Sequence, residues 1–144
     1  LRTGNLALGM LICYESIFPE LAQARVAAGA NILVNISNDG WFGDSSAPEQ
    51  HLQMAALRAV EQNRWLLRGT NTGISGIYDN RGRLVLRGAQ FKAQSVAGQA
   101  RLLTSRSPYH KAAPWIPYAA AALLVVLLLR VPGRARGIPR RISR

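Results

Sequence analysis

The sequence is poor in cysteine, histidine and acidic residues. Cys13 is its only cysteine, which excludes an internal disulfide and leaves the redox compartment open. The two histidines, His51 and His110, lack the spacing of metal ligands, so we infer no metal site and expect no cofactor. Seven Asp and Glu stand against 18 Lys and Arg, and the formal net charge is +11. The chain opens on Leu1 without a signal-peptide pattern, and we expect it to continue a longer protein.

The positive charge is concentrated at the end of the chain. Beyond Leu129 there is no acidic residue, and six arginines occupy positions 130, 134, 136, 140, 141 and 144. Such a basic tail can bind nucleic acid, but here it directly follows a long apolar run, which favours membrane topology instead. We therefore expect no nucleic-acid partner and interpret residues 130–144 as a basic cytoplasmic tail.

Residues 112–129 (AAPWIPYAAAALLVVLLL) form the longest uncharged run of the sequence. A bilayer core of roughly 30 Å needs about 20 apolar residues, with about 17 at the low end, so the run predicts a transmembrane helix. Trp115 and Tyr118 suit one interface, and Lys111 and Arg130 can reach the headgroups. A buried core helix is the alternative, which the aromatic end and the arginine flank disfavour. Because basic flanks stay in the cytoplasm, residues 1–111 should lie outside it.

The first 111 residues alternate between strand-like and helix-like patterns, which predicts an α/β layer continued by antiparallel strands. The expected elements, in chain order, are a strand at 6–12, a helix at 19–28, a strand at 32–36, a loop at 37–47, a helix at 48–63, a strand at 65–67, a hairpin of 74–78 and 83–86, and a weak strand near 99–103.

Cys13 stands where the first apolar strand meets a turn that leads into a helix. A nucleophile on such an elbow projects from the sheet, beside main-chain N–H groups that can bind an oxyanion. A thiol needs a base or a cationic neighbour to react efficiently, and neither histidine lies in a recognisable pairing with it. Because a buried cysteine commonly packs as a small hydrophobe, the residues alone leave both roles open.

Four residues near this elbow and in the loop at 37–47 are further candidates. Glu15 suits a helix entry, or it could orient a substrate amine or tune the thiol. Trp41 and Phe42 lie in a glycine-rich loop, either as an ordinary hydrophobic plug or, beside a membrane, as a contact for acyl chains. Tyr14 follows the cysteine directly, and Asn35 and Asp39 suit turn hydrogen bonds.

Several segments together resemble the apolipoprotein N-acyltransferase family of the nitrilase superfamily. They are residues 9–15 (GMLICYE), 33–43 (LVNISNDGWFG), 50–61 (from QH to RAVE) and 68–75 (RGTNTGIS). Cys-Tyr-Glu alone is weak evidence, whereas its combination with the Asn-Asp-Gly-Trp-Phe-Gly block and a C-terminal span is specific. The resemblance covers nearly the whole chain.

This resemblance implies the C-terminal part of a nitrilase-like αββα sandwich at 1–111, followed by one transmembrane helix at 112–129 and the tail at 130–144. It also implies a Glu–Lys–Cys triad in which Cys13 is the nucleophile and Tyr14 and Glu15 occupy positions that the family uses. The Glu and Lys lie upstream in that family, so this chain alone should be inactive.

The implied reaction moves an acyl chain from a phospholipid, through a Cys13 thioester, to the N-terminal amine of a diacylglyceryl-modified lipoprotein. The implied location is the bacterial cytoplasmic membrane, with the catalytic domain on the periplasmic or outer face. A nitrilase-type amidase that hydrolyses small C–N bonds, and a membrane-tethered binding module with a merely packed cysteine, are the alternatives.

Overall fold

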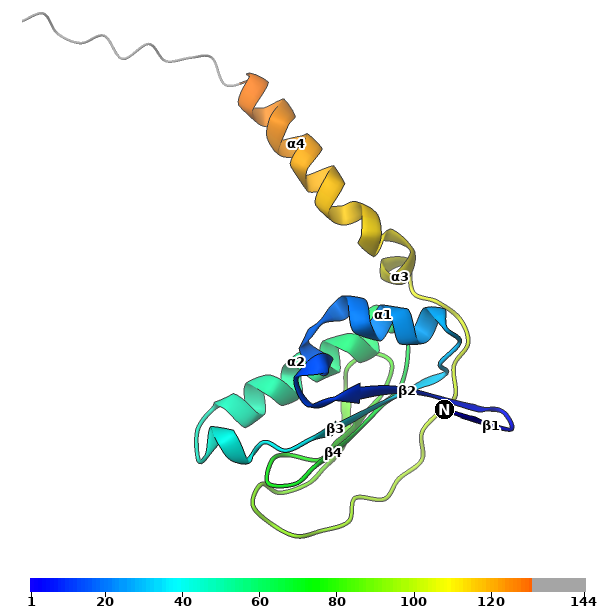
Figure 1. The fold of residues 1–144 in the computed structure, drawn as a ribbon, viewed down its shortest axis with the longest axis vertical. Helices are drawn as coiled ribbons and strands as arrows, with labels where there is room; N and C mark the ends of the chain where they lie inside the picture. The colour runs from blue at the N-terminus through cyan, green and yellow to red at the C-terminus, as the bar shows by residue number, and fades with distance from the viewer. Residues whose placement is uncertain (131–144) are drawn as a thin grey trace, which may run out of the picture. The chain divides into compact units, whose positions relative to one another are not determined.

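The chain divides into two compact units, Leu1–Lys111 and Ala112–Arg144. The computed structural model describes residues 1–130, so the predicted basic tail, apart from Arg130, lies outside the described residues. Unit 1 is a mixed α/β layer, which confirms the predicted fold class, and the described part of unit 2 is helical (Figure 1).

Unit 1 contains a sheet of six strands, which are neighbours in space in the order β1 (Arg2–Thr3), β2 (Leu6–Ile12), β3 (Ile32–Ser37), β4 (Leu66–Thr70), β5 (Gly76–Tyr78) and β6 (Leu84–Arg87). The central strands β2, β3 and β4 are parallel. The outer strands extend this centre by antiparallel pairing on both sides. The carboxyl ends of the three parallel strands therefore meet at one edge of the sheet.

Two helices connect the parallel strands: α1 (Pro19–Ala27) joins β2 to β3, and α2 (Ala47–Gln62) joins β3 to β4. Each has a proline in its first turn. The N–H groups of the first turn have no partner within the helix, so the missing N–H of proline costs no hydrogen bond there. Asn63 ends α2 in the left-handed conformation, with a φ of 51°. Short 3-10 helices η1 (Cys13–Ile17) and η2 (Gly40–Phe42) follow β2 and β3.

The hydrophobic core lies between the helices and one face of the sheet. Leu11, Leu33 and Leu66 are fully buried, and each comes from a different parallel strand. Side chains alternate between the faces of a strand, so the neighbouring Ile12 and Ile36 point the other way and are 54% and 51% exposed. Helices cover only one face of the sheet (Figure 1).

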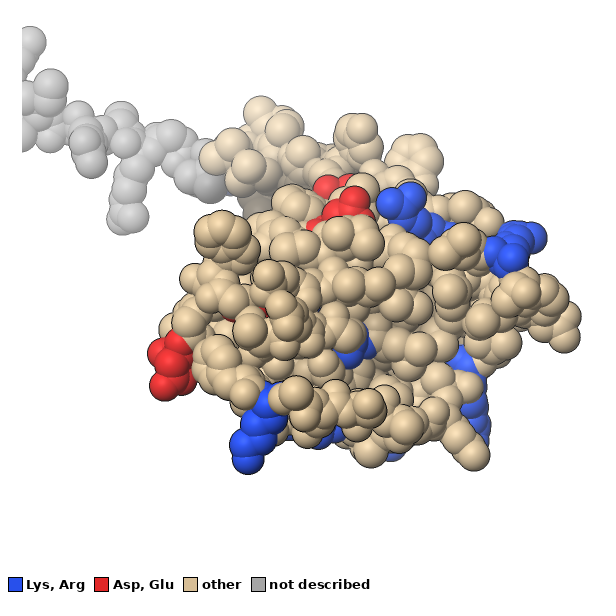
Figure 2. Space-filling model, turned by 60° about the horizontal axis from the view of Figure 1, so that its bottom comes forward, with Lys and Arg blue, Asp and Glu red and all other residues tan. Residues whose placement is uncertain are grey.

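On the face of the molecule shown in Figure 2, the charged side chains lie at isolated points. The face shown in Figure 2 is mostly uncharged, and single basic and acidic side chains are scattered over it. The positive charge of unit 1 therefore does not gather into a continuous patch on this face.

The predicted strand near 99–103 is wrong. Residues 88–107 contain no regular element, and within residues 99–103 the main chain is tied to the sheet region by the Leu103 N–H, which donates to the Asn31 carbonyl at 3.0 Å. The segment is instead held by Arg64, whose guanidinium donates to the carbonyls of Thr104 and Ser105 at 3.3 and 2.5 Å. These hydrogen bonds fix the segment without a strand ladder.

A helical stretch begins at the end of unit 1 in α3 (Pro108–Ala112), passes through η3 (Ala113–Trp115) and continues as α4 (Ile116–Arg130), which forms most of the described part of unit 2. The helical stretch Pro108–Arg130 is long enough to cross a membrane, and it contains an 18-residue window with a mean hydropathy of 2.1 and no buried residue. It is a candidate membrane span, as the sequence predicts.

Candidate active site

The candidate site lies at the edge where β2, β3 and β4 end. The register pairs Ile12 with Ile36 and Ser37 with Thr70, so the segments that follow these strands leave the sheet side by side. In open α/β sheets, ligands bind at the carboxyl ends of the strands. Cys13 is the first residue after β2, and Asp39 follows β3 by two residues.

Cys13 adopts an unusual backbone conformation. Its φ is +50°, in the left-handed region that costs a residue with a Cβ atom about 1–2 kcal/mol. Such a conformation persists only where the surroundings hold it. Here the Cys13 carbonyl accepts hydrogen bonds from Ser16 Oγ and Asn35 Nδ2, both at 3.2 Å, and the thiol-bearing residue is exposed. The strand-end position is the one that the sequence predicts for a nucleophile.

Glu15 stabilises the same turn from the other side. Its Oε2 accepts the main-chain N–H of Ile12 at 2.8 Å, the residue just before Cys13. This contact makes Glu15 part of the scaffold of the elbow. Its predicted role toward a substrate amine or the thiol stays a prediction.

A chain of buried polar contacts begins at Asn35. Asn35 Nδ2 also donates to the Leu11 carbonyl at 2.9 Å, and Asn35 Oδ1 accepts from Arg68 Nη1. Arg68 Nη2 donates to Asp39 Oδ2 at 2.7 Å, in an ion pair whose two side chains are fully buried. The guanidinium thereby connects β4 to β3 and to the loop that follows it.

The same chain returns to the cysteine through His51 of α2. His51 Nδ1 lies 3.1 Å from Asp39 Oδ1 and 3.1 Å from Arg68 Nη2, and His51 Nε2 lies 3.1 Å from Ser16 Oγ. Since Ser16 donates to the Cys13 carbonyl, the contacts close into a ring. We call it the polar ring; its side chains are Ser16, Asn35, Asp39, His51 and Arg68.

Asp39 is strongly held in its ionised form. Burial alone would raise the pKa of this carboxyl, but the contacts with His51 and Ser37 and the positive charge of Arg68 outweigh it and lower the pKa from 3.8 to about 2. Gly73 makes room for this arrangement, because a Cβ atom there would lie 2.6 Å from the Asp39 Cβ. Burial lowers the pKa of Arg68, and the nearby negative charge of Asp39 opposes that shift.

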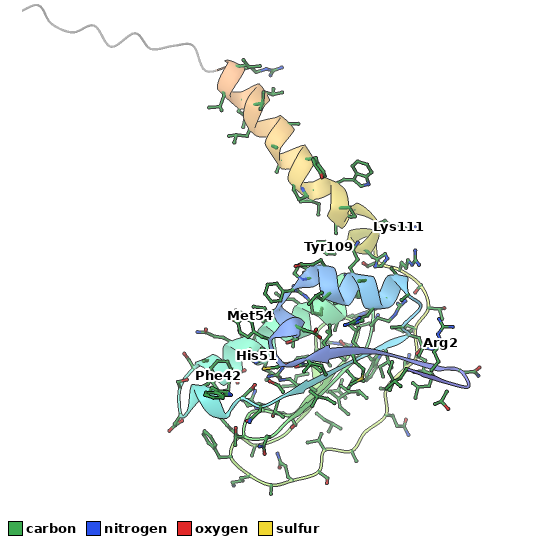
Figure 3. All side chains as sticks on the ribbon, in the orientation of Figure 1. Arg2, Phe42, His51, Met54, Tyr109 and Lys111 are labelled. Atoms are coloured by element: carbon green, nitrogen blue, oxygen red, sulfur yellow. The ribbon has the colours of Figure 1, made fainter. Side chains whose placement is uncertain are left out.

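Aromatic side chains cover the polar ring at His51. The rings of Tyr14 and Phe42 each lie 5.8 Å from the imidazole, measured between ring centroids. With Met54 they line a small cavity of about 80 Å³, and Phe42, His51 and Met54 lie next to one another in Figure 3. Trp41, by contrast, is 91% exposed. The structure thus brings Tyr14 and Phe42 together and leaves Trp41 directed to solvent.

Sequence reasoning did not identify the polar ring. It assigned Asn35 and Asp39 to turns and found no pairing of His51 with Cys13. In the structure, hydrogen bonds link Asn35, Asp39 and His51 into the network around the Cys13 carbonyl. Polar residues inside apolar strand patterns, such as Asn35 and Arg68, were the available signal. Among residues 1–130, no cluster of His, Cys, Asp and Glu could hold a metal ion.

Comparisons with known proteins agree on one superfamily. The sequence model of the carbon-nitrogen hydrolase family matches residues 1–104. The apolipoprotein N-acyltransferase of Geobacter metallireducens is 44% identical over 133 residues, 90% of this chain and 26% of the relative. That of Pseudomonas paraeruginosa is 38% identical over 142 residues, 99% of this chain and 27% of the relative. The chain thus spans about a quarter of the length of these relatives.

The crystal structure of an amidase from Nesterenkonia sp. shares the fold. It superimposes with a TM-score of 0.53 at 19% identity, over 84% of this chain and 46% of the amidase. At this identity the similarity concerns the arrangement of strands and helices.

Proposed function

The chain belongs to the carbon-nitrogen hydrolase family, and from this premise we propose that it is the C-terminal part of a membrane-bound N-acyltransferase with Cys13 as its nucleophile. The observation that carries the proposal is the elbow itself: a cysteine at the end of a parallel strand, in a left-handed conformation held by two hydrogen bonds to its carbonyl. The N-acyltransferases at 44% and 38% identity support the reaction class.

The reaction has two steps. The Cys13 thiolate attacks the ester carbonyl of a phospholipid, the C–O bond breaks, and a lysophospholipid leaves with a proton as the thioester forms. The α-amine of a diacylglyceryl-modified N-terminal cysteine then attacks the thioester, which releases the thiol and yields an amide. A covalent intermediate lets two bulky lipid substrates use one site in turn.

A base and a cation are needed to form the thiolate and to stabilise the charge on the oxyanion. By resemblance to the family, a Glu and a Lys supply these functions, and we place both in the region that precedes this chain in the full-length protein. On this account residues 1–144 are inactive alone.

The apolar stretch Pro108–Arg130 holds the site near the membrane. We place unit 1 on the periplasmic or outer face of the bacterial cytoplasmic membrane and the arginine-rich end in the cytoplasm, following the excess of Arg beyond Leu129. A tag after Arg144 should then be protected from an externally added protease. Cleavage of that tag in intact spheroplasts would overturn the orientation.

Trp41 is suited to contact lipid rather than protein. It is 91% exposed, and it lies between Gly40 and Gly43, the latter with a φ of +56°. Aromatic rings favour the region between headgroups and acyl chains. Trp41→Ala should therefore slow acylation by phospholipid vesicles while leaving the melting temperature nearly unchanged. A lower melting temperature with an unchanged acylation rate would eliminate the lipid contact.

Cys13→Ser in the full-length protein tests the central claim. The purified protein is incubated with a phospholipid, and the peptide containing Cys13 is analysed by mass spectrometry before and after addition of a diacylglyceryl lipopeptide. We expect an acyl adduct on Cys13 that disappears as the lipopeptide is acylated, and no transfer by the variant. Transfer at a near wild-type rate by Cys13→Ser would show that Cys13 is not the nucleophile. Hydrolysis of small amides without lipid transfer would instead favour an amidase, a chemistry carried out by a protein that shares this fold.

A further inference from the structure

The acyl-transfer chemistry gives no role to the polar ring, although the ring is the most completely buried polar feature of the described residues near Cys13. Its side chains are 0–3% exposed. They come from η1, β3, the loop after β3, α2 and β4, so the ring ties together every element that borders the site. Burying such a network is costly unless its polar groups find partners. Each side chain of the ring has at least one, and within residues 1–130 the one buried ring atom without a hydrogen-bond partner is Arg68 Nε.

Part of the ring has the connectivity of a Ser–His–Asp triad. Ser16 Oγ lies 3.1 Å from His51 Nε2, and His51 Nδ1 lies 3.1 Å from Asp39 Oδ1. Ser16 is 0% exposed, however, and its hydroxyl also faces the Cys13 carbonyl at 3.2 Å. A substrate cannot reach this oxygen, so the triad geometry serves the neighbouring cysteine rather than a second nucleophile.

Both ends of the ring converge on one atom, the carbonyl oxygen of Cys13. One arm runs from Arg68 through Asn35, and the other runs from Arg68 through His51 and Ser16. A carbonyl fixed by two donors fixes the ψ of its own residue, and with it the direction of the Cα–Cβ bond that carries the thiol. The left-handed conformation of Cys13 requires such restraint.

The proton of His51 decides how the second arm is connected. With the proton on Nε2, the imidazole donates to Ser16, Ser16 donates to Cys13, and Arg68 donates to Nδ1. With the proton on Nδ1, the imidazole donates to Asp39, and the Ser16 hydroxyl turns toward Nε2 and away from Cys13. In the first tautomer both donors, Ser16 and Asn35, hold the Cys13 carbonyl. Asp39 then keeps its hydrogen bonds from Ser37 and Arg68 but receives none from His51.

We infer that the polar ring is a positioning device for the nucleophile: its two donors hold the carbonyl of Cys13, and its remaining members hold the two donors. This inference rests on the proposed role of Cys13. Ser16 and His51 are positioning residues, because they act through the main chain of Cys13 and touch no substrate.

The test uses Ser16→Ala in the full-length protein, which removes the Ser16 hydroxyl. Two rates of reaction of the Cys13 thiol are then measured. The first measurement is the rate at which iodoacetamide alkylates Cys13, which needs neither lipid substrate. The second is the single-turnover rate of acylation by phospholipid, at varied donor concentration. Ser107→Ala is the matched control, since Ser107 also donates to a main-chain carbonyl, that of Glu61, and contacts no member of the ring.

We expect Ser16→Ala to slow acylation by about 10- to 100-fold with an unchanged half-saturating donor concentration, because misplacement of a reacting group by about 1 Å costs on that order. Alkylation of Cys13 should slow as well. Ser16→Thr keeps the hydroxyl and should restore most of both rates, and Ser107→Ala should match the wild type. If Ser16 served only the overall stability of the protein, these variants would not differ in their alkylation and acylation rates in this way.

Alkylation of Cys13 at the wild-type rate in Ser16→Ala would overturn the inference, whatever the acylation rate. If the wild-type protein transfers no acyl chain but Ser16→Ala still slows alkylation, the proposed function fails and the positioning role stands. Should Ser16→Ala not fold, His51→Leu takes its place. A leucine offers no hydrogen-bonding atom to Ser16, so slowed alkylation supports the inference and an unchanged rate overturns it.

Discussion

Two arginine–carboxylate pairs of unit 1 look alike, although Arg68–Asp39 is fully buried and the Glu61 side chain of Arg58–Glu61 is 18% exposed. The fold shifts the pKa values of their two acids in opposite directions. Arg68 contacts Asp39 at 2.7 Å, and Arg58 contacts Glu61 at 2.8 Å. The environment lowers the pKa of Asp39 to about 2. It raises the pKa of Glu61, because burial outweighs the charge of Arg58 and the hydrogen bond from it.

The difference lies in the number of donors around each carboxylate. Asp39 contacts Ser37 and His51 in addition to its arginine, and both of its oxygens have partners. Within residues 1–130, Glu61 Oε2 is buried without a hydrogen-bond partner. The single cation beside Glu61 therefore does not offset the effect of burial on its pKa, whereas the set of donors around Asp39 does. The fold places that set of donors beside Cys13.

The largest expected effect follows from removing the charge of Asp39. Asp39→Asn leaves the fully buried Arg68 without its counter-ion, which typically costs about 3–5 kcal/mol. Hydrogen exchange of the β4 amides in the full-length protein measures this local free energy of unfolding. A loss below about 1 kcal/mol would show that the pair is replaceable by neutral hydrogen bonds, and the comparison with Glu61 would lose its basis.

Acid should break the same pair without a mutation. Because the pKa of Asp39 is lowered from 3.8 to about 2, its contribution is fully present above pH 3.8 and is lost as the pH falls toward 2. The shift corresponds to about 2 kcal/mol. Unfolding of the full-length protein, followed at several pH values between 5 and 2, should show this loss. In Asp39→Asn the loss across that window should be smaller by the same amount.

Crowding Asp39 from outside the pair should have an intermediate effect. A Cβ atom at Gly73 would lie 2.3 Å from Asp39 Oδ2, the oxygen that Arg68 contacts, so Gly73→Ala must displace the carboxylate. Overpacking of this kind costs about 1–3 kcal/mol. Gly69→Ala is the matched control, because nothing lies within 4 Å of a Cβ atom there. Equal melting temperatures for the two variants would mean that the Asp39 geometry is not tightly held.

The fold and the ring differ in how far the sequence predicts them. The strands 6–12 and 32–36, both helices and the hairpin follow from local patterns of apolar residues, and the structure contains them. The position of Cys13 at the end of a strand is predicted as well, because a strand end followed by a turn is a local feature of the sequence. The error near 99–103 arose where the pattern was weakest. A few contacts, from the Arg64 and Asn63 side chains and from the Leu103 N–H, hold the segment in place of a ladder.

The polar ring could not be predicted because its contacts join residues distant in the sequence. Ser16 and His51 are 35 residues apart, and Asn35 and Arg68 are 33 apart. Pairing them requires the parallel register of β2, β3 and β4, which no local pattern fixes. What the sequence does offer is an anomaly: a polar Asn within ILVNI and an Arg after WLL, each at a position that the strand pattern buries.

Glu61→Gln should have the smallest effect and provides the sharpest contrast with Asp39→Asn. The raised pKa of Glu61 means that the fold favours its neutral form, so stability from this group is present below pH 4.5 and is lost as the pH rises above it. The amide oxygen that the substitution introduces would still accept from Arg58 Nη2, while the burial penalty of the charge disappears. We expect a change below about 1 kcal/mol at pH 7, and the stability of the variant relative to the wild type should improve from pH 4 to 7. The two variants are compared by hydrogen exchange of the β4 and α2 amides under identical conditions. A loss at pH 7 as large as that of Asp39→Asn would show that the arginine charge, and not the number of donors, governs both pairs.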